Sequence, residues 1–242
     1  MIQIIDLHKS FNDQEVLRGV NLAIKQGEIT VILGASGQGK TVLLKHLIGH
    51  LQPDRGKVLV DGVDLTRLDE AALNDIRKKF GMLFQSGALF DSLNVEENVA
   101  FPLREHTDLP DDKIAQTVRE KLHLVGLENV EKKMPSELSG GMRKRVGLAR
   151  AIALQPQIIL YDEPTTGLDP ITTAAINRLI VETQKKLRIT SVIISHDIES
   201  TFKIADKVAM LYEGVIVEEG DPKKFWTSSH PYVREFISSH PS

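Results

Sequence analysis

One glycine-rich segment limits what this chain of 242 residues can fold into. It fits the pattern G-x-x-x-x-G-K-[ST], directly after the apolar run at residues 29–33 and directly before an apolar helical pattern. Its residues are Gly34, Ala35, Ser36, Gly37, Gln38, Gly39, Lys40 and Thr41, followed by Val42. The glycines let backbone N–H groups turn inward around an anion, and the next helix adds the positive end of its dipole. The segment predicts a nucleotide phosphate site in which Lys40 reaches the β- and γ-phosphates and Thr41 ligates Mg²⁺.

The composition is that of a globular protein with a sizeable core, since 41 % of the residues are hydrophobic and 26 % are charged. A net charge of −3 gives no general electrostatic reason to bind nucleic acid or an anionic membrane. The absence of cysteine excludes disulfides and thiolate metal sites. No apolar run approaches the ~18 to 20 residues that cross a bilayer, so any membrane role is expected to depend on a partner chain.

Apolar periodicity predicts the order of the elements. We expect strands at residues 2–7, 16–24, 29–33, 57–60, 80–84, 157–161, 190–194, 208–212 and 215–219. We expect helices at residues 39–49, 70–79, 111–125, 141–154, 170–187 and 198–205, and one that contains Phe225 and Trp226. Strands that alternate with helices imply parallel pairing and a doubly wound α/β sheet. Because strand patterns are missing between residues 86 and 155, this stretch is interpreted as a helical insertion between two strands.

A second, acidic motif narrows the chemistry. The apolar run at residues 158–161 ends in Asp162 and Glu163. Ligands of such sheets bind at the carboxyl ends of the strands, so Asp162 is expected opposite Thr41, where it helps to hold Mg²⁺. Glu163 would then face the γ-phosphate and accept a proton from the attacking water, or orient it. An acidic turn before Pro164 is the structural alternative.

Two further polar residues follow strand patterns in the same way, Gln85 and His196. Each could reach the γ-phosphate or its water, although a single Gln or His at a strand end is more often simply solvated. Together with the acidic pair they predict a hydrolytic site rather than a binding site only. The predicted catalytic residues are Glu163, His196, Gln85 and Lys40, and the predicted metal ligands are Thr41, Gln85 and Asp162.

Motifs in this order resemble those of the ATPase subunits of ATP-binding cassette (ABC) transporters, over essentially the whole chain. Residues 138–142 (Leu-Ser-Gly-Gly-Met) are similar to the signature motif, although Met142 stands where this motif usually has Gln. Residues 166–169 are similar to the D-loop, Gln85 to the Q-loop glutamine and His196 to the switch histidine. Phe11 is similar to the aromatic residue that stacks on adenine. The resemblance thus implies further nucleotide contacts from Phe11, Ser139, Gly140, Gly141 and Asp169.

The resemblance also implies an architecture. It is a P-loop NTPase (RecA-like) core at residues 1–85 and 156–220, with an N-terminal antiparallel β subdomain, a helical subdomain at 86–155 and a C-terminal helical tail at 221–242. In this family the signature segment closes on ATP held by the opposite subunit, which implies a homodimer around two Mg²⁺-ATP. An integral membrane permease is the implied partner, with this chain peripheral to it at the cytoplasmic face of the inner membrane.

The substrate class rests on resemblance alone. Residues 80–103, and the residues after Met142, look most like the Mla-type ATPases of bacterial phospholipid transport. That likeness implies an Mce-domain lipid-binding protein and a small accessory protein as further partners. The alternatives are the ATPase of another ABC importer or exporter, a soluble ABC protein of translation or DNA repair, and a phosphate-loop kinase, which has no need of the signature.

Several patterns leave alternatives open. His46 and His50 have the spacing of two zinc ligands, but no third ligand is near them in the sequence. The basic run at residues 143–145 lacks the aromatic residues of a nucleic-acid patch, so no nucleic-acid partner is predicted. Leu89, Phe90 and Leu93 either form a groove wall for a permease helix or pack inside the helical subdomain. The apolar tail at 223–242 is expected to dock on its own subunit, on the dimer mate or on an accessory protein.

Overall fold

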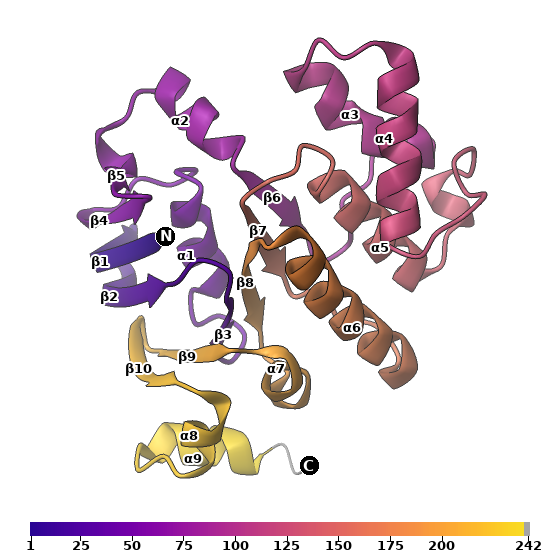
Figure 1. The fold of residues 1–242 in the computed structure, drawn as a ribbon. Helices are drawn as coiled ribbons and strands as arrows, with labels where there is room; N and C mark the ends of the chain where they lie inside the picture. The colour runs from indigo at the N-terminus through magenta and orange to yellow at the C-terminus, as the bar shows by residue number, and fades with distance from the viewer. Residues whose placement is uncertain (240–242) are drawn as a thin grey trace. The chain divides into compact units, whose positions relative to one another are not determined.

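The computed structural model describes residues 1–239, which form two compact units (Figure 1). The first unit contains residues 1–77 and the described residues from 190 onward, and the second unit contains residues 78–189. Within residues 1–239, no helix combines the length and the apolar character that a membrane span requires.

An antiparallel sheet opens the first unit. Its strands, in spatial order, are β2 (Gln14–Ile24), β1 (Ile2–Phe11), β4 (Arg55–Val60) and β5 (Val63–Asp64). At the start of β1, Ile2 and Ile4 are buried, while Gln3 and Ile5, which alternate with them, are exposed. This alternation is typical of a sheet with one covered face, and it places the apolar side chains of β1 in the core.

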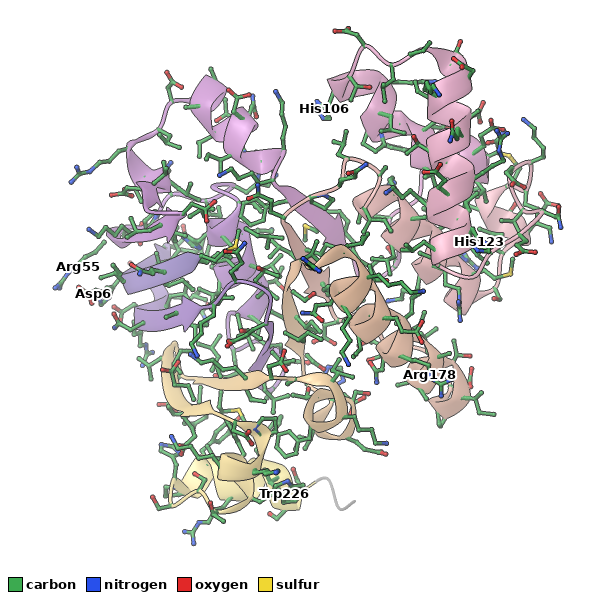
Figure 2. All side chains as sticks on the ribbon, in the orientation of Figure 1. Asp6, Arg55, His106, His123, Arg178 and Trp226 are labelled. Atoms are coloured by element: carbon green, nitrogen blue, oxygen red, sulfur yellow. The ribbon has the colours of Figure 1, made fainter. Side chains whose placement is uncertain are left out.

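Strand β1 extends past the predicted end at residue 7 because, beyond a kink at Asp6, it continues to pair with β2 as far as Phe11. Asp6 adopts a left-handed φ of 48°, and the register with β2 and β4 shifts around it. Only glycine fits opposite, because a Cβ at Gly56 would lie 2.1 Å from the Asp6 carbonyl oxygen. The Asp6 carboxylate accepts an ion pair from Arg55 of β4 at 2.9 Å (Figure 2).

A second group of strands in the first unit is mainly parallel. The strands lie in the order β10 (Val215–Gly220), β9 (Lys207–Tyr212), β3 (Ile29–Leu33) and β8 (Thr190–Ser195). Strand β3 pairs in parallel with β8 and β9, whereas β10 pairs antiparallel with β9. All residues of β3 are buried, as expected for a strand covered on both faces. The predicted α/β class, with a separate antiparallel sheet, is confirmed.

The helices of the first unit follow the predicted order. They are α1 (Lys40–Leu47), α2 (Glu70–Arg77), α7 (Ile198–Ile204), α8 (Pro222–Trp226) and α9 (Pro231–Ser238), with a 3₁₀ turn η1 (Leu65–Arg67). Helix α1 begins directly after the phosphate loop, and Gly49 follows it with a left-handed φ of 64°. That conformation favours glycine and ends the helix near the predicted position.

The tail docks on its own subunit, which was one of the three alternatives that the sequence left open. Phe225 of α8 and Val233, Phe236 and Ile237 of α9 are buried in one cluster with Leu33 of β3. Ala35, at the start of the phosphate loop, packs against the same cluster. Trp226 (Figure 2) is 56 % exposed, and its ring packs at an interplanar angle of 71° to that of Phe202, with 5.3 Å between the ring centroids. Residues 240–242 of the predicted tail lie outside the described residues.

The second unit pairs two parallel strands with a set of helices. The strands are β6 (Phe80–Leu83) and β7 (Ile158–Asp162), in the register Phe80 to Ile158. The helices are α3 (Val95–His106), α4 (Asp111–Leu124), α5 (Gly140–Ala151) and α6 (Pro170–Leu187), with a 3₁₀ turn η2 (Pro135–Glu137). Helix α3 packs on α4 and α5, and the three lie side by side in Figure 1.

Helix α3 was not among the predicted helices. Pro102 lies inside it and interrupts the run of helix-forming residues. Its start nevertheless carries a capping box: the Asn94 side chain accepts from the Glu97 N–H at 2.9 Å, and Glu97 accepts from the Asn94 N–H at 2.8 Å. The pattern N-x-x-E, together with apolar residues spaced by four, was the signal that could have revealed this helix.

The apolar residues after Gln85 divide between the two predicted roles. Leu89 and Leu93 are partly buried, whereas Phe90 is 43 % exposed. The Phe90 ring packs at a tilt against Phe101 of α3, with 4.8 Å between the ring centroids. The second unit therefore presents a pair of exposed aromatic rings beside the segment that follows β6.

Candidate functional site

The phosphate loop joins β3 to α1 within the first unit, and its glycines are dictated by space and backbone conformation. A Cβ at Gly34 would lie 2.5 Å from the Leu211 carbonyl oxygen, so a side chain there displaces backbone. Gly37 and Gly39 have φ values of 83° and 92°, which L side chains rarely adopt. Space therefore requires glycine at Gly34, and backbone conformation strongly favours it at Gly37 and Gly39.

Lys40 is held over this loop. It is 6 % exposed, and its Nζ donates to the Gly34 carbonyl at 2.8 Å and to the Ala35 carbonyl at 2.9 Å. On the other side of the loop, the Gln38 side chain accepts from the Glu213 N–H at 2.8 Å. These contacts hold the loop in a curled form and keep the Lys40 ammonium group against its first two carbonyls. A curled loop with a fixed positive charge is suited to bind an anion of high charge.

The C-terminal helix α9 also reaches the loop. Burial raises the pKa of the Tyr232 hydroxyl, and a backbone hydrogen bond with Ala35 opposes that shift. The Tyr232 ring stacks on Tyr212 at the end of β9, with 3.6 Å between centroids. The C-terminal tail thus packs against Ala35, the second residue of the phosphate loop.

His196 lies at the same sheet edge as the loop. Leu33, the last residue of β3, pairs in register with Ser195, the last residue of β8. Gly34 and His196 each follow one member of this pair, so the parallel register brings the predicted switch histidine beside the loop. Phe11, at the end of β1 in the same unit, is 42 % exposed, and the Lys9 ammonium lies 5.6 Å from its ring centroid.

The second unit brings Gln85 and Glu163 to one cation. Strands β6 and β7 end at the same edge, because Leu83 pairs with Tyr161. The Nζ of Lys144, from α5, donates both to the Gln85 carbonyl and to the Glu163 carbonyl. Sequence reasoning treated Lys144 only as part of a basic run, and nothing in the local pattern distinguishes it from its neighbours.

Glu163 has an unusual backbone. Its φ is 48°, in the left-handed region that non-glycine residues adopt at a cost of about 1 to 2 kcal/mol. Its carboxylate accepts from the Thr166 hydroxyl at 2.6 Å, and its carbonyl accepts from the Thr166 N–H at 3.3 Å. The residue is partly buried.

The predicted signature segment opens α5. Ser139 is the N-cap, and its hydroxyl accepts from the Met142 N–H at 3.2 Å. Gly141 must be glycine, because a Cβ there would lie 2.7 Å from the Thr172 methyl group. Since Ser139 and Gly140 are exposed, the free N–H groups of the first turn face solvent, where an anion can bind them.

Asp169 caps the next helix, α6. Its carboxylate accepts from the N–H groups of Ile171 and Thr172, each at 3.0 Å, and from the Thr172 hydroxyl at 2.6 Å. The hydroxyl contact is the main cause of the lowered pKa of Asp169, with the backbone N–H groups adding to it. Its first role in this chain is therefore to start α6.

The basic run at 143–145 is only partly turned to solvent. Lys144 is 4 % exposed, and the Arg145 guanidinium donates to the Val125 carbonyl at 2.6 Å. Arg143 alone is exposed. His46 is buried on α1, where its Nδ1 donates to the Val42 carbonyl at 2.8 Å and burial lowers its pKa. Within residues 1–239, no three His, Asp or Glu side chains are grouped closely enough to hold a metal.

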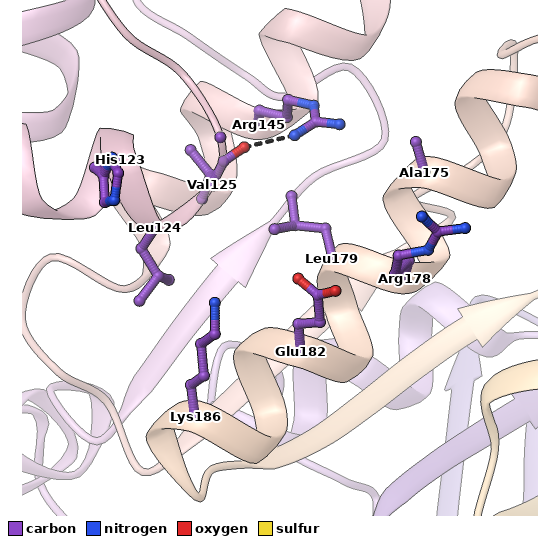
Figure 3. Close-up of a pocket in the computed structure, with 10 residues that line it drawn as sticks. His123, Leu124, Val125, Arg145, Ala175, Arg178, Leu179, Glu182 and Lys186 are labelled. Carbon is purple, nitrogen blue, oxygen red and sulfur yellow. Dashed lines mark hydrogen bonds between the residues drawn. The ribbon is translucent and has the colours of Figure 1, made fainter.

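One pocket of about 300 Å³ lies within the second unit, away from the predicted residues (Figure 3). It is formed by the end of α4, by α5 and by α6, and the Arg145 contact to Val125 forms part of its wall. Arg178, Lys186 and Glu182 line the α6 side. The lining mixes four basic side chains, those of His123, Arg145, Arg178 and Lys186, with one carboxylate, and none of the predicted site residues contributes to it.

Comparison with known proteins identifies the family. Residues 17–166 match the family model described as ABC transporter. The chain is 47 % identical to the probable ribonucleotide transport ATP-binding protein mkl of Mycobacterium leprae, over 98 % of this chain and 68 % of that protein. It is 45 % identical to the intermembrane phospholipid transport ATP-binding protein MlaF of Haemophilus influenzae, over 98 % of this chain and 90 % of that one.

Solved structures agree with the fold. The cbiO1 protein of Clostridium perfringens, part of an ABC transporter complex, matches with a TM-score of 0.87 and 31 % identity, over 98 % of both chains. A dimeric ATP-binding cassette in a post-hydrolysis state, bound to ADP and Pi, matches with a TM-score of 0.83 and 31 % identity, over 92 % of this chain and 99 % of that chain. The fold is that of a P-loop NTPase. The chain belongs to the ABC transporter family and is an ATP-binding ATPase of that family.

Proposed function

We propose that this chain hydrolyses Mg²⁺-ATP as a homodimer and thereby drives a separate integral membrane permease. The observation that carries the proposal is the presence, in one chain, of a glycine-dictated phosphate loop and of a solvent-facing helix start at Ser139 and Gly140. The first can hold the nucleotide of its own subunit, and the second offers free N–H groups to the nucleotide of another.

Within one subunit, the phosphates are held by the loop and by Lys40. The residues that contact nucleotide are proposed to be Phe11, Gly34, Ala35, Ser36, Gly37, Gln38, Gly39, Lys40, Thr41 and Val42, with Asp162. Glu163 acts on the attacking water, while Gln85 and His196 contact that water or the γ-phosphate. The exposed ring of Phe11 supports stacking on the adenine.

The donor set fits Mg²⁺. Thr41 offers a hydroxyl, Gln85 an amide oxygen and Asp162 a carboxylate, and a hard divalent cation prefers such oxygen ligands. Bound Mg²⁺ neutralises charge on the phosphates. Thr41 and Gln85 are both exposed in this structure and therefore accessible to the ion.

The second half of each site is proposed to come from the other subunit. Ser139, Gly140 and Gly141 would contact the γ-phosphate there, with Asp169 at the same interface. The dimeric cassettes among the solved relatives support this arrangement. ATP would then stabilise a closed dimer, and hydrolysis would release it.

For the transported substrate we favour phospholipid, moved between the inner and outer membranes of a bacterium. The support is the MlaF relative, of which this chain covers 90 % of the length, against 68 % of the mycobacterial relative with a different named substrate. An Mce-domain protein and a small accessory protein would be further partners, at the cytoplasmic face of the inner membrane. The exposed Phe90 and Phe101 rings suit the docking of a permease helix.

Glu163→Gln tests the ATPase site. The substitution keeps the shape of the side chain but removes its basicity, so ATP hydrolysis should fall by about 10² to 10⁴, while ATP binding persists and a dimer accumulates. Light scattering with ATP, beside the hydrolysis assay, measures both effects. Unchanged hydrolysis in this variant would refute the role of Glu163.

Co-purification from detergent tests the transport role. A tagged copy in its native host should bring down a membrane permease, and the reconstituted complex should move labelled phospholipid between vesicles only with ATP. A complex that moves another solute, and no lipid, would favour the alternative of a different ABC system.

A further inference from the structure

Lys144 is a buried cation without a place in the roles proposed so far. It lies one turn inside α5, and only 4 % of it is exposed. Lysine is almost never buried to this extent unless its ammonium group is paired, because removing the charge from water is costly. Here the compensation comes from two carbonyl oxygens, those of Gln85 and Glu163.

The charges around Lys144 belong to the same site. Burial lowers the pKa of its ammonium group, and the carboxylates of Asp162 and Glu163 oppose that shift. The Lys144 ammonium group thus lies in the electrostatic field of the acidic pair. It is also hydrogen-bonded to the backbone carbonyls of Gln85 and Glu163. Its nearest partners are two of the residues that we assign to the hydrolytic step.

The two carbonyls need a support of this kind. Glu163 has a left-handed backbone, which is intrinsically unfavourable for a residue with a Cβ. Thr166 makes two hydrogen bonds to Glu163, one to its carboxylate and one to its carbonyl. The Nζ of Lys144 donates to the same carbonyl at 3.3 Å. The Lys144 contacts link the Glu163 turn to the segment after β6.

The segment after β6 is fastened to the same helix. Arg150 of α5 donates to the Gly87 carbonyl at 3.1 Å. The helix approaches so closely at Gly147 that a Cβ there would lie 3.0 Å from the Gly87 carbonyl oxygen and 2.8 Å from a Leu83 methyl group. Helix α5 therefore carries the Gln85 segment with it, and Lys144 is the point at which this assembly reaches Glu163.

We infer that Lys144 is a positioning residue that fixes the Gln85 segment relative to Glu163, and through α5 ties both to the signature segment. The inference rests on the proposed hydrolytic function of Gln85 and Glu163. Lys144 touches neither ATP nor water in this role.

Three variants of the full chain test the inference. Lys144→Met keeps the length and removes the donor, Lys144→Arg keeps donors and charge, and Lys121→Met is the matched control. Lys121 is also a buried lysine of the second unit, 8 % exposed on α4, and burial lowers its pKa too. It makes none of the contacts to Gln85 or Glu163.

We expect Lys144→Met to lower kcat for ATP hydrolysis by about tenfold or more, as for the loss of hydrogen bonds to a charged donor. The Kd for a fluorescent ATP analogue should stay within about threefold, because the phosphate loop is untouched. Lys144→Arg should restore most of kcat, and Lys121→Met should leave it within about twofold. A thermal melt shows whether each variant is folded, and Lys144→Leu, which also lacks a donor, replaces Lys144→Met if the latter is not.

The outcomes separate the two proposals. Unchanged kcat in Lys144→Met, or an equal loss in Lys121→Met, overturns the positioning role while the ATPase assignment stands. A loss that appears only in the Kd also overturns it, because positioning acts on the catalytic step. Absence of ATP hydrolysis in the unsubstituted chain, with its partners present, overturns the proposed function and the inference with it.

Discussion

The phosphate loop and the Glu163 turn are both left-handed backbone features, and they are held in opposite ways. In the loop, glycines adopt positive φ freely, and the lysine bonds to carbonyls only five and six residues away. At Glu163 a residue with a side chain adopts φ 48°, held by Thr166 nearby and by Lys144 from another helix. The phosphate loop is determined by residues within one short segment, whereas the Glu163 turn depends on tertiary packing.

We expect the largest change in the free energy of unfolding from a substitution in the tail, which packs against the start of the phosphate loop. Phe225→Ala removes a fully buried ring from the cluster that contains Leu33 and packs against Ala35. The free energy of unfolding should therefore fall by about 3 to 5 kcal/mol. Denaturant unfolding measures this, and Trp226→Ala, at an exposed neighbour, is the control with a change below about 1 kcal/mol. Equal effects would mean that the tail does not dock as the structure has it.

Gly34→Ala tests the local geometry of the loop. The new methyl group would meet the Leu211 carbonyl oxygen at 2.5 Å, so the backbone must move, at a cost of about 1 to 3 kcal/mol. ATP affinity should fall about 10- to 100-fold, measured by titration calorimetry. Gly27→Ala places a methyl group in open space at φ 74° and should leave the affinity unchanged. Retained affinity in Gly34→Ala would contradict the close approach.

Thr166→Val tests how much of the Glu163 turn is held locally. It keeps the shape but removes the hydroxyl that donates to the Glu163 carboxylate, which should lower kcat about tenfold, as for one hydrogen bond to a charged group. Thr166→Ser keeps the hydroxyl and should retain most of the activity. The comparison with Lys144→Met then ranks local against long-range support. If neither variant lowers kcat, the turn is fixed by other contacts.

Asp169→Ala should have the smallest effect, and one that depends on pH. Because hydrogen bonds lower the pKa of Asp169 in the folded state, its contribution is present above the unfolded pKa of about 3.9 and is lost as pH falls through the lower folded value. Above pH 5 the variant should be slightly less stable than the unsubstituted chain, and the difference should shrink as the pH falls below the unfolded pKa. Thermal melts over this range measure it; a difference that grows in acid would contradict the capping role.

Much of the fold could be predicted, because each segment carried its own periodicity. The buried strand β3 is a continuous apolar run, and β1 alternates as a strand with one covered face should. Helix α3 was missed because Pro102 masked a pattern whose capping box was present at Asn94. Strand β1 passes through a kink at Asp6, and this kink requires glycine at Gly56 of the neighbouring strand β4. The local pattern of β1 does not encode that contact.

The sequence by itself determined the phosphate loop, the acidic strand end and the family, since these depend on residue types at fixed short spacings. Tertiary structure alone decided that the tail supports the loop, that Phe90 is exposed, and that Lys144 joins Gln85 to Glu163. The physical reason is range. A glycine at positive φ is selected by its own backbone, but a lysine becomes a buried link only through groups 59 and 19 residues away, whose positions no local pattern encodes.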